Sequence, residues 1–539
     1  MKKIWRAMAG VAAVLLLLTG CVGQQQNAEI SNEDVQPINL DTANPEANNM
    51  PISDEPLTLS AITTSKLSVA GQTYGYNDVK AFAKMEEISG VKVDFQTVET
   101  ERINLMFATD DLPDLILLNW SSVGSVLDYA KEGQVIALDD YMSKYAPNMV
   151  NYMKDNRDVY SQMAESDGNL YTFPFIRGEE VLRVFQGFQI RQDWLDKLNL
   201  EMPQTRDEFY NVLKAFKEQD PNGNGIADEI PYIAEKKFGI DRMFNFWGKD
   251  AMYVDNGVVK CGWTEPEFEE YVRWLNRLYN EGLIDPDYAI TERTQFDYKV
   301  SNELGGAWYG LAASGLGRLS TLMAPVNPKF SISGMPWLEA NDGKKYVVNS
   351  EFVTEASTLG YAISSQCKNV KEAVKWLDYA YSEEGQILYN FGVEGESYTM
   401  VDGVPTYTEN ISHNPDGIPM TEMISLFAVP SGYPTLQSVD YFDQYMQEKQ
   451  KAAINVWKNA DMSRSIPSLR FSSAESKNVN QKYNEIKSYH DEIINKFIVG
   501  KEPLDNFSKY VQTIQSMGIK DVVASYQTAY DRYCSRLGK

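Results

Sequence analysis

The sequence predicts an α/β fold in which helices cover the faces of largely parallel sheets. Apolar stretches typical of strands alternate with stretches whose apolar residues recur at helical spacing. The alternation starts near residue 57 and repeats along the chain. With 539 residues, the chain is long enough for two or more domains with large cores.

The first expected elements follow the order strand, helix, strand, helix, strand. They are "LTLSAIT" (57–63), "YNDVKAFAKMEEISG" (76–90), "VKVDFQTV" (91–98), a helix that starts near Glu101, and "LILL" (115–118). Gly90 should end the first helix, as glycine commonly does. This order is typical of a parallel sheet with helices on its faces, where ligands bind at the carboxyl ends of strands.

Similar patterns continue along the chain. Thr205 and Glu208 have the spacing of a capping box, which places a helix start at this point. Strands are expected at 167–175, at the start of 184–200, at 305–310 and at 358–366, and helices in the rest of 184–200, at 205–220, 265–282 and 369–389, and in the tail from Val479.

The N-terminal residues 1–20 have the features of a secretory signal. A basic start precedes an apolar run that is shorter than the roughly 20 residues of a membrane span. "LTGC" (18–21) resembles the lipobox of bacterial lipoproteins, which implies cleavage before Cys21 and its lipidation. The alternative is an ordinary secretory signal with a chance cysteine. Residues 21–55 are polar and nearly free of aromatic side chains, so we expect a lipidated flexible tether.

Charge and composition argue against nucleic-acid binding and against cysteine- or histidine-based sites. The net charge of −25 argues against nucleic-acid binding, which needs a basic face. Beyond Cys21 the chain has an odd number of cysteines and no CxxC spacing, so neither a disulfide framework nor a zinc site is implied. With only two histidines, a histidine-based metal centre or catalytic triad is disfavoured.

Several motifs together carry a resemblance to a known family. "LPDLI", "GNLYTFPF", the block from "IRQDW" to "GIADEIPY", "NVKEAVKWLDYAYSEEG" and "FGVEGESY" resemble the extracellular solute-binding lipoproteins of carbohydrate ABC importers. The chain is similar to the maltose-binding type and to alginate-oligosaccharide binders with the same "DPNGNG" loop. The resemblance implies a two-lobed periplasmic-binding-protein-like (type II) fold with a hinge, a sugar in the cleft, permease subunits as partners and a monomer on the outer face of the cytoplasmic membrane.

The implied domain boundaries follow the expected crossings between lobes. The N-terminal lobe would comprise 56–175 plus 351–397. The C-terminal lobe would comprise 176–350 plus 398–539, including the C-terminal helices.

The loop "DPNGNGIADEIP" (220–231) has the donor spacing of a calcium loop. Gly225 falls where an EF-hand loop needs glycine, but Pro231 stands where its bidentate glutamate would be. The resemblance to alginate binders supports Glu229 as the substitute. The alternative is an Asn/Gly-rich turn without metal. The expected ligands of a structural Ca²⁺ are Asp220, Asn222, Asn224, the Ile226 carbonyl, Asp228 and Glu229.

Candidate sugar contacts are aromatic residues at strand ends and polar residues near the crossings. Aromatic rings stack on sugar faces while fixed polar groups bind the hydroxyls. The alternative for Arg177 and Glu180 is a solvated loop, and the alternative for Glu396 and Tyr398 is a role in the hinge. The full expected set is Trp120, Trp247, Trp308, Tyr309, Trp337, Arg177, Glu180, Glu396 and Tyr398.

Two other classes of protein remain as alternatives. A cell-surface glycoside hydrolase or polysaccharide lyase would need a defined carboxylate pair, which 75 acidic residues make easy to imagine and hard to identify. An oligopeptide-binding lipoprotein would have a similar size and anchor. The sequence lacks a nucleophile elbow, a phosphate loop and an HExxH motif, so we expect no catalysis.

Overall fold

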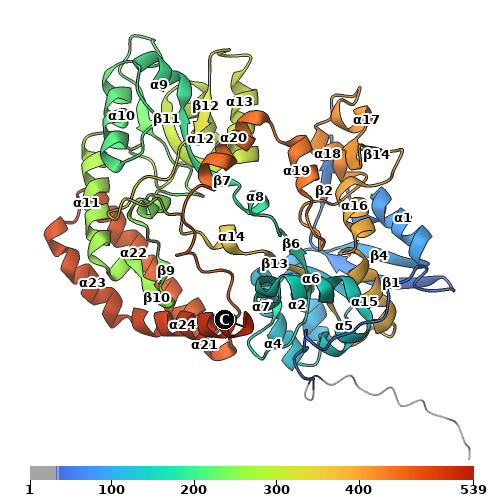
Figure 1. The fold of residues 1–539 in the computed structure, drawn as a ribbon. Helices are drawn as coiled ribbons and strands as arrows, with labels where there is room; N and C mark the ends of the chain where they lie inside the picture. The colour runs from blue at the N-terminus through green and yellow to red at the C-terminus, as the bar shows by residue number, and fades with distance from the viewer. Residues whose placement is uncertain (1–31, 33–34, 539) are drawn as a thin grey trace, which may run out of the picture.

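The computed structural model describes residue 32 and residues 35–538, so the predicted signal and Cys21 lie outside it. Figure 1 shows two lobes, each with its own sheet and surrounding helices. A mixed α/β architecture with two lobes and a helical C-terminal region is therefore present, as the sequence predicts.

The sheet of the first lobe has the strand order β4-β1-β5-β13-β6. β1 pairs in parallel with β4 and β5, whereas β13 is antiparallel to β5 and β6. The start of β13 lies beside the end of β6, because the chain leaves the lobe along one strand and returns along the other. The strands are β1 (Leu57–Thr63), β4 (Val91–Thr97), β5 (Leu115–Asn119), β6 (Phe173–Ile176) and β13 (Ala356–Ile363).

Helices cover this sheet because their apolar residues fall on one side. In α1 these are Ala81, Phe82 and Met85, and the helix ends at Gly90 with a φ of +70°. A Cβ at Gly90 would lie 2.4 Å from the Ser53 carbonyl oxygen, so only glycine fits. The helices of this lobe are α1 (Lys80–Ser89), α2 (Thr100–Thr109), α3 (Trp120–Val123), α4 (Val126–Lys131), α5 (Asp139–Tyr145), α6 (Pro147–Asp155), α7 (Arg157–Met163), α15 (Val370–Tyr379), α16 (Glu383–Phe391), α17 (Glu409–Ser412) and α18 (Met420–Ser425).

The sheet of the second lobe has the order β12-β7-β11-β8. Its central strands β7 (Gln186–Arg191) and β11 (Gly305–Leu311) are buried on both faces. The capping box at the start of α10 is confirmed, since Thr205 Oγ1 accepts from Glu208 N at 3.2 Å. The other elements are β8 (Ile230–Tyr232), β12 (Ile332–Gly334), α9 (Gln192–Leu198), α10 (Arg206–Glu218), α11 (Pro266–Asn280), α12 (Arg293–Ser301), α13 (Arg318–Met323) and α20 (Glu448–Trp457).

Smaller elements complete the chain. The hairpin strands are β2 (Leu67–Val69), β3 (Gln72–Tyr74), β9 (Met252–Asp255), β10 (Val258–Cys261), β14 (Tyr398–Val401) and β15 (Val404–Tyr407). The 3₁₀ helices are η1 (Tyr76–Asp78), η2 (Asp241–Trp247), η3 (Gly262–Thr264) and η6 (Leu504–Asn506), and the π-helices are η4 (Ala312–Gly317) and η5 (Asn478–Lys482).

Three crossings connect the lobes and carry α8 (Glu180–Arg183), α14 (Ser350–Val353) and α19 (Val439–Tyr445). They run side by side, since Arg177 N donates to Glu355 O and Ile176 N donates to Thr435 O. The expected boundary at 397 differs from the structure. Residues 398–436 stay with the first lobe, where the Leu426 and Phe427 carbonyls accept from the N-terminus of α1.

The C-terminal helices are α21 (Ser473–Lys477), α22 (Tyr483–Ile498), α23 (Phe507–Ser516) and α24 (Ile519–Arg536). α24 lies across both lobes. Gln527 bonds to the β9–β10 hairpin of the second lobe, and the Tyr533 carbonyl accepts from Ser161 Oγ of the first lobe at 2.6 Å. The C-terminal extension therefore contacts both lobes instead of extending the second lobe alone.

The predicted tether is wrong for residues 35–55. Ile38 and Leu40 are buried in the first-lobe core, and Ile38 N donates to Asp139 Oδ1 at 2.9 Å. Asn48 also bonds to Asp378. A segment of low average hydrophobicity packs here because its few apolar side chains meet a surface formed by other elements.

Leu40→Ala should lower the free energy of unfolding by about 2–4 kcal/mol, because it removes a fully buried side chain and leaves a cavity. Denaturant unfolding followed by tryptophan fluorescence measures the change. Asn49→Ala, at an exposed position of the same segment, is the control and should change stability little. If both variants unfold like the parent protein, the segment is a tether after all.

Candidate functional site

Arg177 lies where the chain first leaves the N-terminal lobe. It directly follows β6, and its guanidinium carbon is 5.2 Å from the ring centre of Phe175 and 5.1 Å from that of Phe185. Phe175 belongs to the first lobe, and Phe185 precedes β7 of the second. The guanidinium is thus held between aromatic rings from the two sides of a crossing.

The other two crossings contribute groups that act on this guanidinium. Burial lowers the pKa of Arg177, while Glu351 of α14 and then Tyr445 and Tyr441 of α19 oppose that shift. The two tyrosine ring centres are 4.9 Å apart, and burial raises the pKa of Tyr445 to about 12. We call Arg177, Phe185, Glu351, Tyr441 and Tyr445 the junction cluster.

Arg183, six residues further on, differs sharply from Arg177. It donates to the carbonyls of Arg177, Gly178 and Phe352 and lies 3.3 Å from Glu355. Its donors thus brace two crossings against each other. The guanidinium of Arg177, by contrast, has no hydrogen-bond or ion-pair partner among the described residues. Arg183 therefore stabilises the junction, and Arg177 keeps its donors available.

The junction cluster has the chemistry that binds hydroxyl-rich rings. Aromatic faces can stack on C–H surfaces, while the guanidinium, the carboxylate and the phenol groups can bond to oxygen atoms. Because the cluster draws on all three crossings, a ligand bound here would contact both lobes and sense their relative orientation.

The structure places most of the predicted aromatic contacts in the core. Trp120 is buried, and its indole N–H donates to the Gly360 carbonyl at 3.1 Å. Trp337 is buried and donates to the Trp457 carbonyl. Both indoles therefore lack a free face for a ligand, so the prediction is corrected for these residues.

Trp308 and Tyr309 were predicted because they end β11, yet both are buried in the second-lobe core. They line only a cavity of about 10 Å³, which is room for no more than a single water molecule. The strand-end argument is wrong here because β11 is covered on both faces, so side chains at its end meet protein instead of a cleft.

The remaining predicted contacts are spread over the surface and the first lobe. Glu180 is exposed in α8, and Glu396 is exposed and pairs with Lys80 at 2.8 Å. Tyr398 is buried in β14, on the first-lobe side. Of the predicted polar residues, only Arg177 belongs to the junction cluster. Phe185, Glu351, Tyr441 and Tyr445 were missed, although two tyrosines four residues apart in "DYFDQYM" are a helical-face signal.

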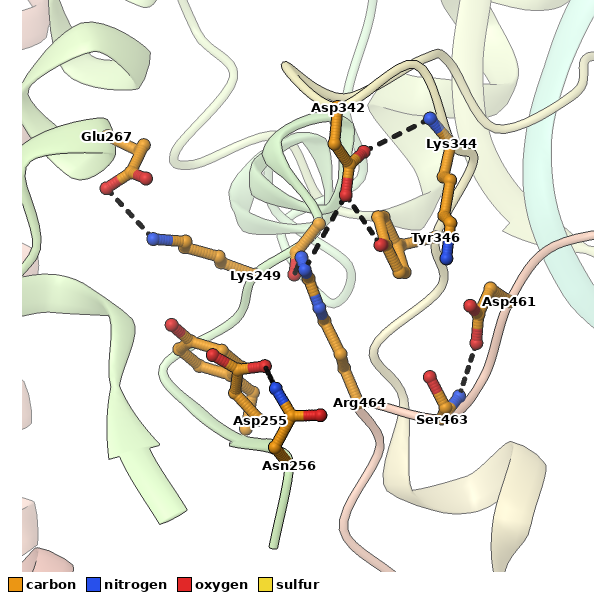
Figure 2. Close-up of polar contacts among 12 residues, drawn as sticks. Lys249, Asp255, Asn256, Glu267, Asp342, Lys344, Tyr346, Asp461, Ser463 and Arg464 are labelled. Atoms are coloured by element: carbon orange, nitrogen blue, oxygen red, sulfur yellow. Dashed lines mark hydrogen bonds and ion pairs between the residues drawn. The ribbon is translucent and has the colours of Figure 1, made fainter. Parts of the chain in front are cut away.

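Trp247 lines one of two adjoining polar pockets of the second lobe, with volumes of about 340 and 430 Å³. Most of their charged groups are already paired, whereas Lys344 and Asp461 form no ion pair within 4.0 Å among the described residues. Lys249 pairs with Glu267 at 2.9 Å, and Arg464 lies 3.7 Å from Asp342 in the wall between the pockets (Figure 2). Such pairing is typical of a structural surface network. Of the two groups without an ion pair, Lys344 is exposed and Asp461 accepts from Ser463 N at 2.8 Å.

A cavity of about 480 Å³ beside α10 also lacks the chemistry of a binding site. Of its two carboxylates, Glu201 is exposed to solvent, and Glu208 already accepts the backbone N–H groups of Gln204 and Thr205 in the capping box. Volume alone therefore does not identify a binding site, and the junction cluster is the candidate because the guanidinium of Arg177 has no hydrogen-bond or ion-pair partner among the described residues.

The loop after α10 is tightly hydrogen-bonded around Asp220. Its carboxylate accepts the backbone N–H groups of Gly223, Asn224 and Gly225 at 2.8–3.1 Å. The side-chain amides of Asn222 and Asn224 donate to Asp228 at 3.2 Å. The expected donors are therefore gathered on one loop.

Glu229 differs from Asp220 and Asp228, because its carboxylate accepts no hydrogen bond from the loop. Its side chain is only 8% exposed, and neither carboxylate oxygen has a hydrogen-bond partner within the described chain. Burial raises the pKa of Glu229, the nearby backbone N–H groups of Glu229 and Asn222 oppose that shift in part, and repulsion from Asp220 and Asp228 adds to it. A turn without metal needs no such carboxylate, whereas a hard cation would offset both the burial and the repulsion.

A cluster of three or more His, Cys, Asp or Glu side chains able to hold a metal is not found among residues 35–538. Asp220, Asp228 and Glu229 are three such carboxylates, so they do not converge on one point in the described loop. The donor types still suit a hard cation, because calcium loops combine carboxylates with asparagine side chains and a backbone carbonyl. The residues present thus fit a cation of this kind.

Comparisons with known proteins bear on both the fold and the site. The family model described as bacterial extracellular solute-binding protein matches residues 70–387. A fructooligosaccharide ABC transporter substrate-binding protein of Streptococcus pneumoniae is 28% identical over 341 residues, which cover 59% of this chain and 61% of that protein. A polygalacturonan/rhamnogalacturonan-binding protein of Bacillus subtilis is 23% identical and covers 84% of this chain and 88% of its own length.

Solved structures of similar proteins share this fold over 89% of the chain. The alginate-binding protein AlgQ2, solved without calcium ion, has a TM-score of 0.67 at 25% identity and covers 89% of this chain and 99% of its own. The fructooligosaccharide-binding protein of S. pneumoniae in complex with kestose has a TM-score of 0.68 at 22% identity, with the same coverage, and supports the fold alone. A further structure is that of an EF-hand mutant of the same protein in complex with fructo-nystose.

Proposed function

Because the chain belongs to the family of bacterial extracellular solute-binding proteins, we propose that it is the substrate-binding protein of a carbohydrate ABC importer. It captures an oligosaccharide at the junction cluster and delivers it to permease subunits. The observation that carries the proposal is the unpartnered guanidinium of Arg177, set among aromatic rings where the crossings meet.

The chemistry of the cluster and the relatives support the same class of ligand. Tyr445 and Phe185 are only partly buried, so each offers aromatic surface for stacking. The relatives named above include binders of fructooligosaccharides, of polygalacturonan and of alginate. A glycoside hydrolase, a polysaccharide lyase and an oligopeptide binder are the alternatives, and no feature of the junction favours them.

Delivery requires that the lobes close on the ligand and that the protein stays near its transporter. The crossings are short segments that can absorb a hinge rotation. Lipidation of Cys21 would hold the protein as a monomer on the outer face of the cytoplasmic membrane, since two acyl chains give stable anchoring. Within residues 35–538, no helix has the length and apolar character needed to cross a membrane.

Tyr445→Ala should weaken oligosaccharide binding by roughly 1–3 kcal/mol, because an aromatic contact at the ligand is lost. The unfolding temperature should change little, since Tyr445 is only partly buried. Isothermal titration calorimetry against a panel of oligosaccharides measures the affinity, and X-ray scattering should show compaction with ligand.

Tyr298→Ala is the matched control, because Tyr298 is 63% exposed on α12 and should not affect binding. Chromatography of the recovered sugar should find it intact. Cleavage that survives repurification would instead support the hydrolase or lyase, and selective binding of peptides would support the oligopeptide binder.

We also propose one structural Ca²⁺ in the loop 220–229. The residues that would hold it are Asp220, Asn222, Asn224, Asp228, Glu229 and the carbonyl of Ile226. The buried, unpartnered carboxylate of Glu229 carries this proposal. The ion would neutralise the crowded carboxylates and fix the loop between α10 and β8, on the second lobe.

A further inference from the structure

We infer that the bound oligosaccharide carries a carboxylate, as a uronate does, and that Arg177 receives it. This inference rests on the proposed function and specifies its substrate class. The relatives do not decide the point, because they are named for neutral as well as acidic sugars. The inference depends instead on three features of the junction cluster, namely the surroundings of Arg177, the hydrogen bond of Glu351 and the two tyrosines.

The first feature is the surroundings of the guanidinium. Arg177 is partly buried, and its planar group lies near two aromatic rings that restrict its orientation. A desolvated cation is costly unless an anion or several acceptors compensate it. The described residues supply neither within bonding distance, in contrast to Arg183 with its three carbonyls and Glu355.

The second feature is Glu351, whose carboxylate most opposes the lowered pKa of Arg177. Glu351 acts on Arg177 only at a distance, since the two form no ion pair within 4.0 Å. One oxygen of Glu351 instead accepts from Gln186 Nε2 at 2.5 Å. Glu351 therefore bonds to Gln186 at the start of β7, and the guanidinium of Arg177 keeps its donors for another acceptor.

The third feature is the pair of tyrosines. Tyr441 and Tyr445 lie one helical turn apart on α19, with ring centres 4.9 Å apart, and their phenol groups are protonated at neutral pH as tyrosines ordinarily are. Protonated phenols are hydrogen-bond donors and suit an anionic ligand. A guanidinium with neighbouring donors matches a planar carboxylate, which accepts two parallel bonds, better than it matches a single sugar hydroxyl.

The test compares acidic oligosaccharides with neutral versions of the same skeleton. Oligogalacturonates and alginate oligomers, and their carboxyl methyl esters, are titrated into the protein by calorimetry. We expect at least one free acid to bind roughly 10- to 100-fold more tightly than its ester, the range for a charge-assisted bidentate contact. Arg177→Gln should remove this preference, and Arg177→Lys should retain part of it.

Arg273→Gln is the matched control, because it removes the same charge from an exposed position of α11, where Arg273 pairs with Glu269. It should keep the full preference for the acid. Thermal unfolding confirms that each variant is folded, and Arg177→Lys provides a second reading if the glutamine variant is not.

The outcomes distinguish a failure of the carboxylate inference from a failure of the proposed function. If esters bind as tightly as acids, if only neutral oligosaccharides bind, or if a folded Arg177→Gln keeps the preference, the carboxylate inference is wrong while the proposed function stands. If no carbohydrate of either kind binds, the proposed function itself fails. A preference for the acid that depends on Arg177 supports both.

Discussion

Removal of calcium is expected to lower the thermal stability of this protein. An ion that binds only the folded state stabilises it by RT ln(1 + [Ca²⁺]/Kd), which is about 2.7 kcal/mol at one hundred times Kd. Without the ion, the buried carboxylate of Glu229 lies unpartnered beside Asp220 and Asp228. Differential scanning calorimetry with chelator, and then with added Ca²⁺, measures the loss and its recovery.

Two variants and a control make the result specific to the loop. Asp220→Ala combined with Asp228→Ala should abolish the response to Ca²⁺. Glu229→Gln should also abolish it, and should unfold at a higher temperature than the parent in chelator, because a buried charge is removed. Asp416→Ala, at an exposed position of another loop, should keep the full response. No melting shift and no bound metal by elemental analysis would leave only a hydrogen-bonded turn.

The pKa of Glu229 adds a dependence on pH. Because its folded-state pKa is raised above the ordinary 4.5, the metal-free folded state holds the proton more tightly than the unfolded chain. Its contribution to stability is therefore present below pH 4.5 and is lost as pH rises through the folded-state pKa. Calcium needs the ionised carboxylate, so the stabilisation by Ca²⁺ should grow over that same range.

Local patterns in the sequence predicted local structure well. "LTLSAIT" forms β1 with the expected bounds, and the spacing of Thr205 and Glu208 marks the start of α10. Both signals depend on neighbours along the chain. The place of β13 between β5 and β6 depends on strands more than 170 residues away, and no local pattern encodes that pairing.

The candidate site was harder to predict for the same reason. Arg177, Glu351 and Tyr445 come from three separate crossings, so only the fold brings them together. The loop around Asp220 is contiguous, and its gathered donors could be identified from spacing alone. The lack of a hydrogen-bond partner for Glu229 could not be predicted from spacing, because burial depends on how the whole structure packs.

Trp308 shows how a strand-end rule fails when a strand is buried on both faces. Its side chain is 1% exposed, and the indole N–H donates to Gln189 Oε1 at 2.9 Å. The ring also meets Phe296 edge to face, with centres 5.9 Å apart. The expected role of Trp308 is therefore in the stability of the second lobe instead of ligand stacking.

Trp308→Ala should accordingly lower the free energy of unfolding by about 3–5 kcal/mol, through lost burial and the cavity left behind. It also leaves the side-chain oxygen of Gln189 without its donor, which adds to the loss. Trp308→Phe keeps most of the volume and should cost less. Denaturant titration of both variants measures the two effects, and calorimetry on the folded fraction should find oligosaccharide affinity close to that of the parent. Unchanged stability with lost affinity would return Trp308 to the ligand site and contradict its place in the core.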